Sequence, residues 1–286
     1  MNTIVSLFIA LTLFSTMLAL GLSLRVDALK PWLNRPGLPL RVLLGSCVLV
    51  PLLALLLLQT PWSQTIAQPA RYAIALMALC PSAPLTLRKA RKAGGDHQLA
   101  GLLQVGAALS AIVTIPLMGL AFRQSFAVLG WEIQPLDVAL QVARVQVLPL
   151  LIGMALRHWK SPIAERLKGP LDRIANGLLL LLVLLVLLKA GPLLLTYIPH
   201  NLPALALMAL MAGASLALGG ALAGAPSTHR RTAALVVSMR NPGLALLFAN
   251  LHGANLPGLK LGVLVYVLVT VILTIPVMRA KSPLQP

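Results

Sequence analysis

Long apolar runs alternate with short polar segments along the whole chain. Nine runs reach the length of about 20 residues that a helix needs to cross the hydrocarbon core of a bilayer. Clusters of turn-forming residues separate the runs, such as KPWLNRPGLP after the first and AGAPSTHR after the seventh. The pattern predicts an all-α polytopic membrane protein with nine transmembrane helices. They are expected near residues 3–24, 39–58, 70–91, 97–122, 135–157, 167–189, 202–222, 231–251 and 258–279.

Composition supports a membrane protein over a soluble one. The 286 residues are 58% hydrophobic and 10% charged, too apolar for a soluble domain to cover. The net charge of +17 does not indicate nucleic acid, because membrane proteins keep Lys and Arg on cytoplasmic loops. Cys47 and Cys80 lie inside apolar runs and are interpreted as packing residues rather than a disulfide. The N-terminus lacks the basic region and cleavage site of a signal peptide.

The basic residues predict an orientation. Of the 23 Lys and Arg, seventeen lie in or beside the loops after odd-numbered helices, or in the C-terminal tail, and four lie on the opposite side. The positive-inside rule then places the N-terminus outside and the C-terminus in the cytoplasm, in the cell (inner) membrane. Topology does not explain Arg144 and Arg240, which lie deep inside predicted helices.

Two predicted helices are interrupted at matching places. Pro81 lies about eleven residues into the third helix and Asn241 about ten into the eighth, so both breaks fall near the bilayer midplane. The two helices run in opposite directions, five apart in order. This predicts an inverted repeat that lacks its first helix, with a first repeat at about 1–124 and a second at about 135–280. Such paired breaks indicate a transporter's binding site, although a single kink is common in membrane helices.

Several motifs resemble the bile acid:sodium symporter family. ALGLSLRVDALK followed by LLGSCVLVPLLA resembles the family's first helix pair. CPSAPLTLRKARKAGGDHQLA resembles its first crossover helix, and VVSMRNPGLALLFANLH resembles the second, which typically reads E-x-x-x-Q-N-x-x-L-A. The resemblance implies a panel domain and a core domain, with the two broken helices crossing in the core. It also implies secondary transport of an organic anion, driven in the family by two sodium ions.

The sequence departs from the family at nearly every sodium ligand. Oxygen-bearing family residues are replaced or shortened at the end of the first crossover, in the next helix, in the second crossover and in the second predicted helix. The positions concerned are Thr86, Leu87, Gln104 to Ala108, Val236, Arg240 and Ser46. Sodium requires several hard oxygen ligands, and a fixed positive charge repels it. We therefore expect no metal or cofactor, with sodium sites rebuilt from backbone carbonyls and Thr86 as the alternative.

Arg240 is the residue that most needs an explanation, because a charge at membrane depth costs roughly 2.5 kcal/mol or more. We hypothesise that its guanidinium substitutes covalently for the cation and completes an anion site. The planar fork suits a carboxylate, sulfonate or phosphate. The alternatives are snorkelling to an interface or pairing with carbonyls exposed at the break. Asn241 is expected to cap the second half-helix, and a contact with substrate is a further role.

Other polar residues near the breaks complete the candidate site. Arg144 shares a helix face with Gln141 and either lines the cavity or packs against a neighbouring helix's carbonyls. Arg88 either belongs to the cytoplasmic basic cluster or faces the cavity. The histidines are too dispersed for a metal site. The candidate substrate-binding residues are Arg240, Asn241, Ser238, Thr86, Ser82, Gln104, Arg144 and Arg88.

The sequence thus predicts a sodium-independent secondary transporter of a small organic anion. A sodium-coupled symporter with rebuilt ion sites is the nearest alternative. A membrane-embedded lipid enzyme is a remote one, because the spans contain no Asp, Glu or central His to act as acid, base or metal ligand. A channel is disfavoured because polar pore rings are absent.

Overall fold

The computed structural model describes residues 2–126, 135–253 and 256–279, which form helices and turns without a strand. Seven helical segments in these ranges are long and apolar enough to cross a membrane. They are Ile4–Ser23, Gly37–Gln59, His97–Ser125, Pro135–Trp159, Leu202–Ala223, Ser227–Leu251 and Leu259–Arg279. The prediction of an all-α multi-pass membrane protein is confirmed, whereas the count of nine spans stays a prediction.

The first half of the chain contains three long helical segments and one interrupted one. Its elements are α1 (Asn2–Ser23), α2 (Val26–Leu33), α3 (Gly37–Leu44), the π-helix η1 (Gly45–Leu49), α4 (Val50–Gln59), α5 (Pro61–Gln64), α6 (Gln68–Leu79), α7 (Thr86–Lys92) and α8 (His97–Phe126). The predicted span near 70–91 is divided between α6 and α7, so neither piece alone crosses a membrane.

The second half has a similar construction. Its elements are α9 (Pro135–Val142), the π-helix η2 (Ala143–Val147), α10 (Leu148–Trp159), α11 (Ser161–His200), α12 (Leu202–Ala223), α13 (Ser227–Ser238), α14 (Pro242–His252) and α15 (Leu259–Arg279). The span predicted near 167–189 is only the middle of α11, because the polar residues before it continue the helix and Pro192 does not end it.

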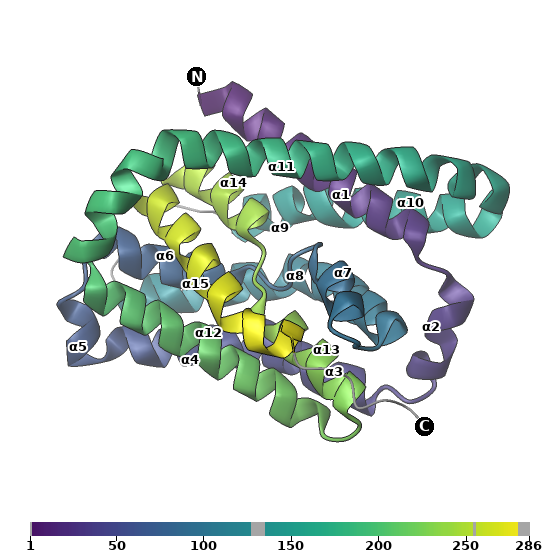
Figure 1. Cartoon of the computed structure of the whole chain (residues 1–286), viewed down its shortest axis with the longest axis horizontal. Coiled ribbons are helices and arrows are strands. Elements are labelled where there is room, and N and C mark those ends of the chain that lie inside the picture. The colour runs from purple at the N-terminus through teal and green to yellow at the C-terminus, as the bar shows by residue number, and fades with distance from the viewer. Residues whose placement is uncertain (1, 127–134, 254–255, 280–286) are drawn as a thin grey trace.

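Two sets of helices lie at opposite edges of the structure, and a third set lies between them (Figure 1). Figure 1 shows α1, α10 and α11 along one edge and α4 with α12 along the opposite edge, with α6, α7, α13 and α15 between them. Helix α1 packs closely on α10 because two glycines meet there. A Cβ on Gly21 would lie 2.3 Å from the Leu150 carbonyl oxygen, and one on Gly153 would lie 2.5 Å from the Leu18 carbonyl oxygen. Helix α12 approaches α13 at Gly219 in the same way.

The interrupted helices are the most enclosed part of the structure. In the segment Ser227–Leu251, 89% of the membrane-length window is buried, against 33–50% in the other six segments. Helix α6 is buried along nearly its whole length, from Tyr72 to Leu79. The breaks therefore lie where most backbone groups are buried and must find protein partners.

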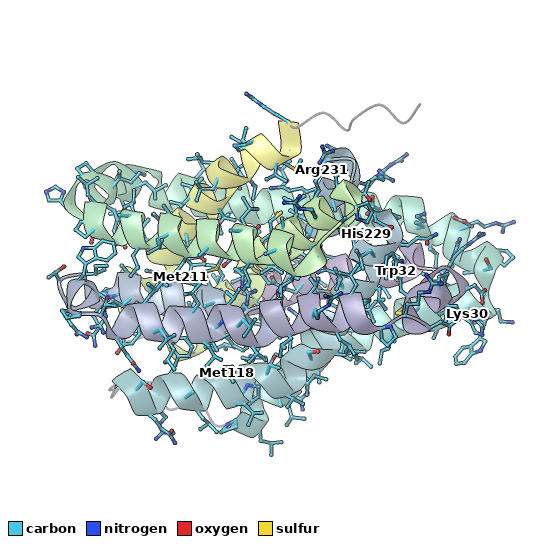
Figure 2. All side chains as sticks on the ribbon, turned by 90° about the horizontal axis from the view of Figure 1, so that it is seen from below. Lys30, Trp32, Met118, Met211, His229 and Arg231 are labelled. Carbon is cyan, nitrogen blue, oxygen red and sulfur yellow. The ribbon has the colours of Figure 1, made fainter. Side chains whose placement is uncertain are left out.

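One end of the bundle is polar. In Figure 2, Lys30, Trp32, His229 and Arg231 lie at the same end of the molecule, away from Met118 and Met211. The Trp32 and His229 rings make an edge-to-face contact with centroids 5.0 Å apart. This end carries the loops after the first and seventh predicted helices, and the distribution of basic residues predicts that it is the cytoplasmic one.

Candidate functional site

Both predicted helix breaks are present. Helix α6 ends at Leu79, directly before the Cys80–Pro81 step, and α7 begins at Thr86, after the non-helical residues 80–85. Proline has no amide hydrogen to continue the helix, and Ser82 turns the chain with a φ of +36°. Helix α13 ends at Ser238, and Pro242 begins α14 at a position where its missing donor is not needed.

The two breaks meet and bond to each other through the backbone. The Ala83 amide donates to the Met239 carbonyl at 2.9 Å, and the Asn241 amide donates to the Cys80 carbonyl at 3.0 Å. All four residues are buried. Each break thus satisfies backbone groups that the other leaves unpaired, which buried backbone requires.

Arg240 lies inside this crossing with 2% of its surface exposed. Its Nε donates to the Met77 carbonyl at 3.0 Å, and its Nη2 donates to the Ala78 carbonyl. Its Nη1 donates to the Ser46 carbonyl at 2.9 Å and the Ser46 hydroxyl at 3.0 Å, with a longer contact of 3.4 Å to the Val237 carbonyl. The structure therefore shows the alternative in which Arg240 pairs with carbonyls at the break, and burial excludes snorkelling. The hypothesis that its guanidinium completes an anion site stays a prediction.

The position of these carbonyls explains why a cation is stable there. Met77 and Ala78 lie in the last turn of α6, where carbonyls have no partner within the helix and the helix dipole is negative. Ser46 belongs to η1, and π-helical turns of this kind frequently mark functional sites. Arg240 thereby ties three elements, η1, α6 and α13, to one point.

Asn241 has two separate roles at the second break. Its Oδ1 accepts a hydrogen bond from the Leu244 amide at 3.1 Å, which confirms the predicted cap of α14. Its Nδ2 is buried and has no hydrogen-bond partner among the described residues. A buried donor without a partner is costly, so this amide is suited to a ligand that supplies an acceptor.

Ser82 and Gln104 form a reciprocal pair. The Ser82 hydroxyl donates to Gln104 Oε1 at 2.8 Å, and Gln104 Nε2 donates back to the Ser82 carbonyl at 3.1 Å. This pair holds the first break against α8. Thr86 is fully buried, and its hydroxyl has no hydrogen-bond partner within the described part of the chain. The Ser238 hydroxyl makes a 3.5 Å contact to the Leu235 carbonyl.

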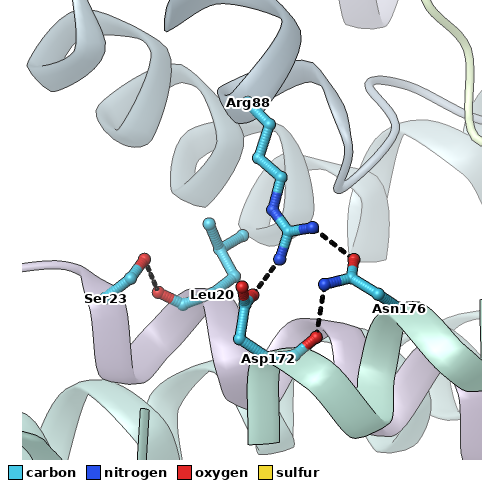
Figure 3. Close-up of polar contacts among 5 residues, drawn as sticks. All are labelled: Leu20, Ser23, Arg88, Asp172 and Asn176. Atoms are coloured by element: carbon cyan, nitrogen blue, oxygen red, sulfur yellow. Dashed lines mark hydrogen bonds and ion pairs between the residues drawn. The ribbon is translucent and has the colours of Figure 1, made fainter. Parts of the chain in front are cut away.

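The two other candidate arginines lie outside the crossing. Arg88 reaches from α7 to α11, where Nη2 bonds Asp172 Oδ1 and Nη1 bonds Asn176 Oδ1 (Figure 3). Arg144 belongs to η2 and is exposed, whereas Gln146, two residues further on in the same π-turn, is buried. The role of Arg144 in substrate binding stays a prediction.

Two adjoining cavities lead to the crossing. The larger, of about 130 Å³, lies between α1, α7, the start of α8 and α11. Its polar lining residues are Thr16, Ser23, Arg88, Arg91, His97, Lys168, Asp172 and Asn176. The smaller, of about 40 Å³, reaches Ala83, Asn241 and Gly243. Thr16, Pro84 and Leu85 line both cavities, so the two adjoin and are together called the path, with basic residues at its mouth and the crossing at its inner end.

The sequence did not predict two residues of the site, Asp172 and Asn176. Asp172 and Asn176 lie one helical turn apart on α11 and bind Arg88 from a distance of more than 80 residues in sequence. Their i, i+4 spacing indicates that both residues lie on one face of α11. It does not identify Arg88 as the residue that this face contacts.

A membrane protein with two interrupted helices that cross at a buried point beside a polar path has the construction of a transporter. The model of the sodium bile acid symporter family matches residues 10–197, from α1 to the last turns of α11, and the chain belongs to this family. Members of the family are transporters rather than enzymes, with the bilayer as environment and a small solute as substrate. No curated protein matches the sequence. The second break lies beyond the matched residues, so its assignment rests on its motif and geometry.

Proposed function

We propose that this protein is a secondary transporter that carries a small organic anion across the cell membrane without sodium. The observation that carries the proposal is that the Arg240 guanidinium donates hydrogen bonds to backbone and hydroxyl oxygens at the helix crossing. Carbonyl and hydroxyl oxygens are the ligands that a hard cation prefers. In this proposal the permanent charge of Arg240 stabilises the crossing, where family members use a bound sodium ion.

The side chains around the crossing do not fit sodium. Leu87 and Val236 are buried and contribute no oxygen, and the Arg240 charge repels a cation. Thr86 is the one hydroxyl retained at the end of the first crossover. The symporter alternative requires a site built from Thr86 and backbone carbonyls, several of which Arg240 already takes.

The path favours an anion. The mouth is lined by three permanently basic residues, Arg88, Arg91 and Lys168, against Asp172 as the acidic residue among the described lining residues. At the inner end, the N-terminus of α14 and the unpartnered Nδ2 of Asn241 supply positive potential and a donor. The donors of Arg240 are engaged with carbonyls, so this residue contributes its charge rather than a direct contact.

Transport in this proposal follows the architecture that the sequence predicts. The panel consists of α1, α9, α10 and α11 and the core of the remaining helices, within nine spans arranged as an inverted repeat. The first repeat is about 1–124 and the second about 135–280, with the N-terminus outside and the C-terminus in the cytoplasm. Movement of the core against the panel exposes the crossing to one side at a time.

The test is binding to the purified full chain by thermal shift, with succinate, benzoate and cholate as probes. Each is measured in sodium chloride and in choline chloride at matched ionic strength. A ligand that prefers the folded state raises the melting temperature. We expect at least one acid to stabilise the protein equally in both salts, and the same acid to be taken up by proteoliposomes in choline. Stabilisation or uptake that requires sodium would contradict the proposal.

A further inference from the structure

The ion pair between Arg88 and Asp172 connects two helix groups across the larger cavity, the proposed core that includes α7 and the proposed panel that includes α11. Arg88 lies on α7, which continues directly from the crossing, whereas Asp172 lies on α11 beside α1 and α10. Backbone packing between α7 and α11 is sparse. Figure 3 shows the guanidinium reaching from one helix to the other, with Asp172 and Asn176 as its two partners. Side chains, rather than interlocked helices, hold the two groups together at this point.

The contact has the chemistry of a releasable carboxylate site. The Arg88 and Asp172 side chains are 37% and 48% exposed, and ion pairs at such exposure contribute little to stability. Arg88 directs its two Nη atoms at two separate acceptors, one on Asp172 and one on Asn176. A free carboxylate fits both Nη atoms at once with better geometry than this divided arrangement.

We propose that Asp172 is a built-in competitor of the transported anion. In the ligand-free state Asp172 and Asn176 hold Arg88 and thereby latch α7 to α11. A ligand carboxylate that enters the cavity displaces Asp172 from Arg88 and releases the latch. The surplus of basic lining residues, Arg91 and Lys168, compensates the ligand charge that is added. This inference rests on the proposed transport of an organic anion and identifies the substrate group as a carboxylate.

The first experiment tests the latch without any ligand. Thr16 lines both cavities, and the native Cys47 and Cys80 are buried, so Thr16→Cys provides a reporter at the inner end of the path. The rate of its reaction with a membrane-impermeant maleimide is measured from the cytoplasmic side. We expect Asp172→Asn to raise this rate severalfold. Arg173→Gln, a charge loss on the adjacent exposed residue, is the matched control and should leave the rate unchanged.

The second experiment tests displacement. Binding of benzoate, succinate and cholate at pH 7 is compared with binding of uncharged benzamide, by thermal shift of the full chain. Removal of an internal competitor lowers the apparent Kd, so Asp172→Asn should bind the acids several-fold more tightly than wild type. Arg88→Gln should lose most acid binding, and benzamide should not distinguish the variants.

The outcomes separate this inference from the proposed function. An unchanged labelling rate in Asp172→Asn shows that no latch exists. Acid binding that Asp172→Asn leaves unchanged or weakens shows that Asp172 does not compete, and the displacement step is then wrong. If neither wild type nor Asp172→Asn binds any acid, the organic-anion function itself is contradicted, whereas the labelling result still decides whether the latch exists.

Discussion

Arg240 and Ser46 are joined by two hydrogen bonds from a single nitrogen, since Arg240 Nη1 donates to both the carbonyl and the hydroxyl of Ser46. Arg240 follows the C-terminal end of α13 and Ser46 lies in η1, 194 positions away in the sequence. The arrangement resembles the binding of an ion by two oxygens of one residue. It also makes the hydroxyl removable while the carbonyl remains, which allows the contact to be weakened in steps.

Ser46→Ala should destabilise the protein modestly. The substitution deletes one acceptor of a charged donor but leaves the Ser46, Met77 and Ala78 carbonyls, so we expect a loss of about 1–2 kcal/mol. The measurement is the unfolding free energy in mixed micelles, with the half-buried Ser110→Ala as control. An effect no larger than the control's would show that the Ser46 hydroxyl is not an acceptor of Arg240.

Gln104→Leu should be more disruptive at the first break. The Ser82 carbonyl and hydroxyl are buried and both lose their partner, and each unsatisfied buried group costs about 1–3 kcal/mol. We expect a lower melting temperature together with weaker binding of any acid that stabilises wild type. Gln98→Leu, at an exposed position on the same helix, is the control and should change neither.

Glu165 should make stability depend on pH in the acidic range. Hydrogen bonding from Arg157, together with its charge, holds the pKa of Glu165 below its ordinary value of 4.5. A carboxyl whose pKa is lowered by folding contributes stability above its ordinary pKa and loses that contribution as pH falls through the folded value. Because the Arg157 side chain is only 5% exposed, protonation of Glu165 leaves a buried cation without its counterion.

The corresponding measurement is melting temperature against pH from 7 down to 3.5. We expect wild type to lose stability below about pH 4.5 and Glu165→Gln to be less stable at pH 7 with a flatter profile. Asp27→Asn serves as comparison, because its partner Lys30 is exposed and the pair is solvated. Equal profiles for wild type and Glu165→Gln would show that the Arg157 contact does not contribute.

Local signals in the sequence account for what could be predicted. Pro81 and the Asn241–Pro242 step are local helix-breaking signals at matching depths, so both breaks could be predicted from the sequence. Proline alone does not suffice, since Pro116 and Pro192 lie inside continuous helices. The capping role of Asn241 likewise follows from its position before Pro242. These features depend on neighbours in the chain, which the sequence shows directly.

The features that could not be predicted depend on contacts between residues far apart in the sequence. Arg240 bonds backbone carbonyls of Met77 and Ala78, and a carbonyl is present at every residue, so the sequence does not distinguish its partners. Regular helical spacing places Arg144 on one face with Gln141, whereas the π-turn η2 at Ala143–Val147 departs from that spacing, which the sequence does not indicate. Asp172 meets Arg88 only because α7 and α11 face the same cavity.

Restoring the family residues of the second crossover should create a sodium requirement. Val236 lies in the last turn of α13, directly before the break that contains Arg240, and both residues are buried, so Glu at 236 and Gln at 240 would both lie at the crossing. In Val236→Glu/Arg240→Gln the Met77 and Ser46 carbonyls lose the guanidinium and gain a nearby carboxylate. Oxygen ligands with a compensating negative charge are what sodium prefers. We expect sodium to stabilise this variant over choline, by about 1.4 kcal/mol at a concentration tenfold above Kd.

The control is Val236→Gln/Arg240→Gln, which has the same size and lacks the carboxylate. It should be less stable than wild type in both salts, because neither ion nor guanidinium then occupies the carbonyls. Wild type should show no difference between sodium and choline. A sodium-stabilised wild type, or a folded Val236→Glu/Arg240→Gln variant that is indifferent to sodium, would show that Arg240 does not stand in the place of an ion.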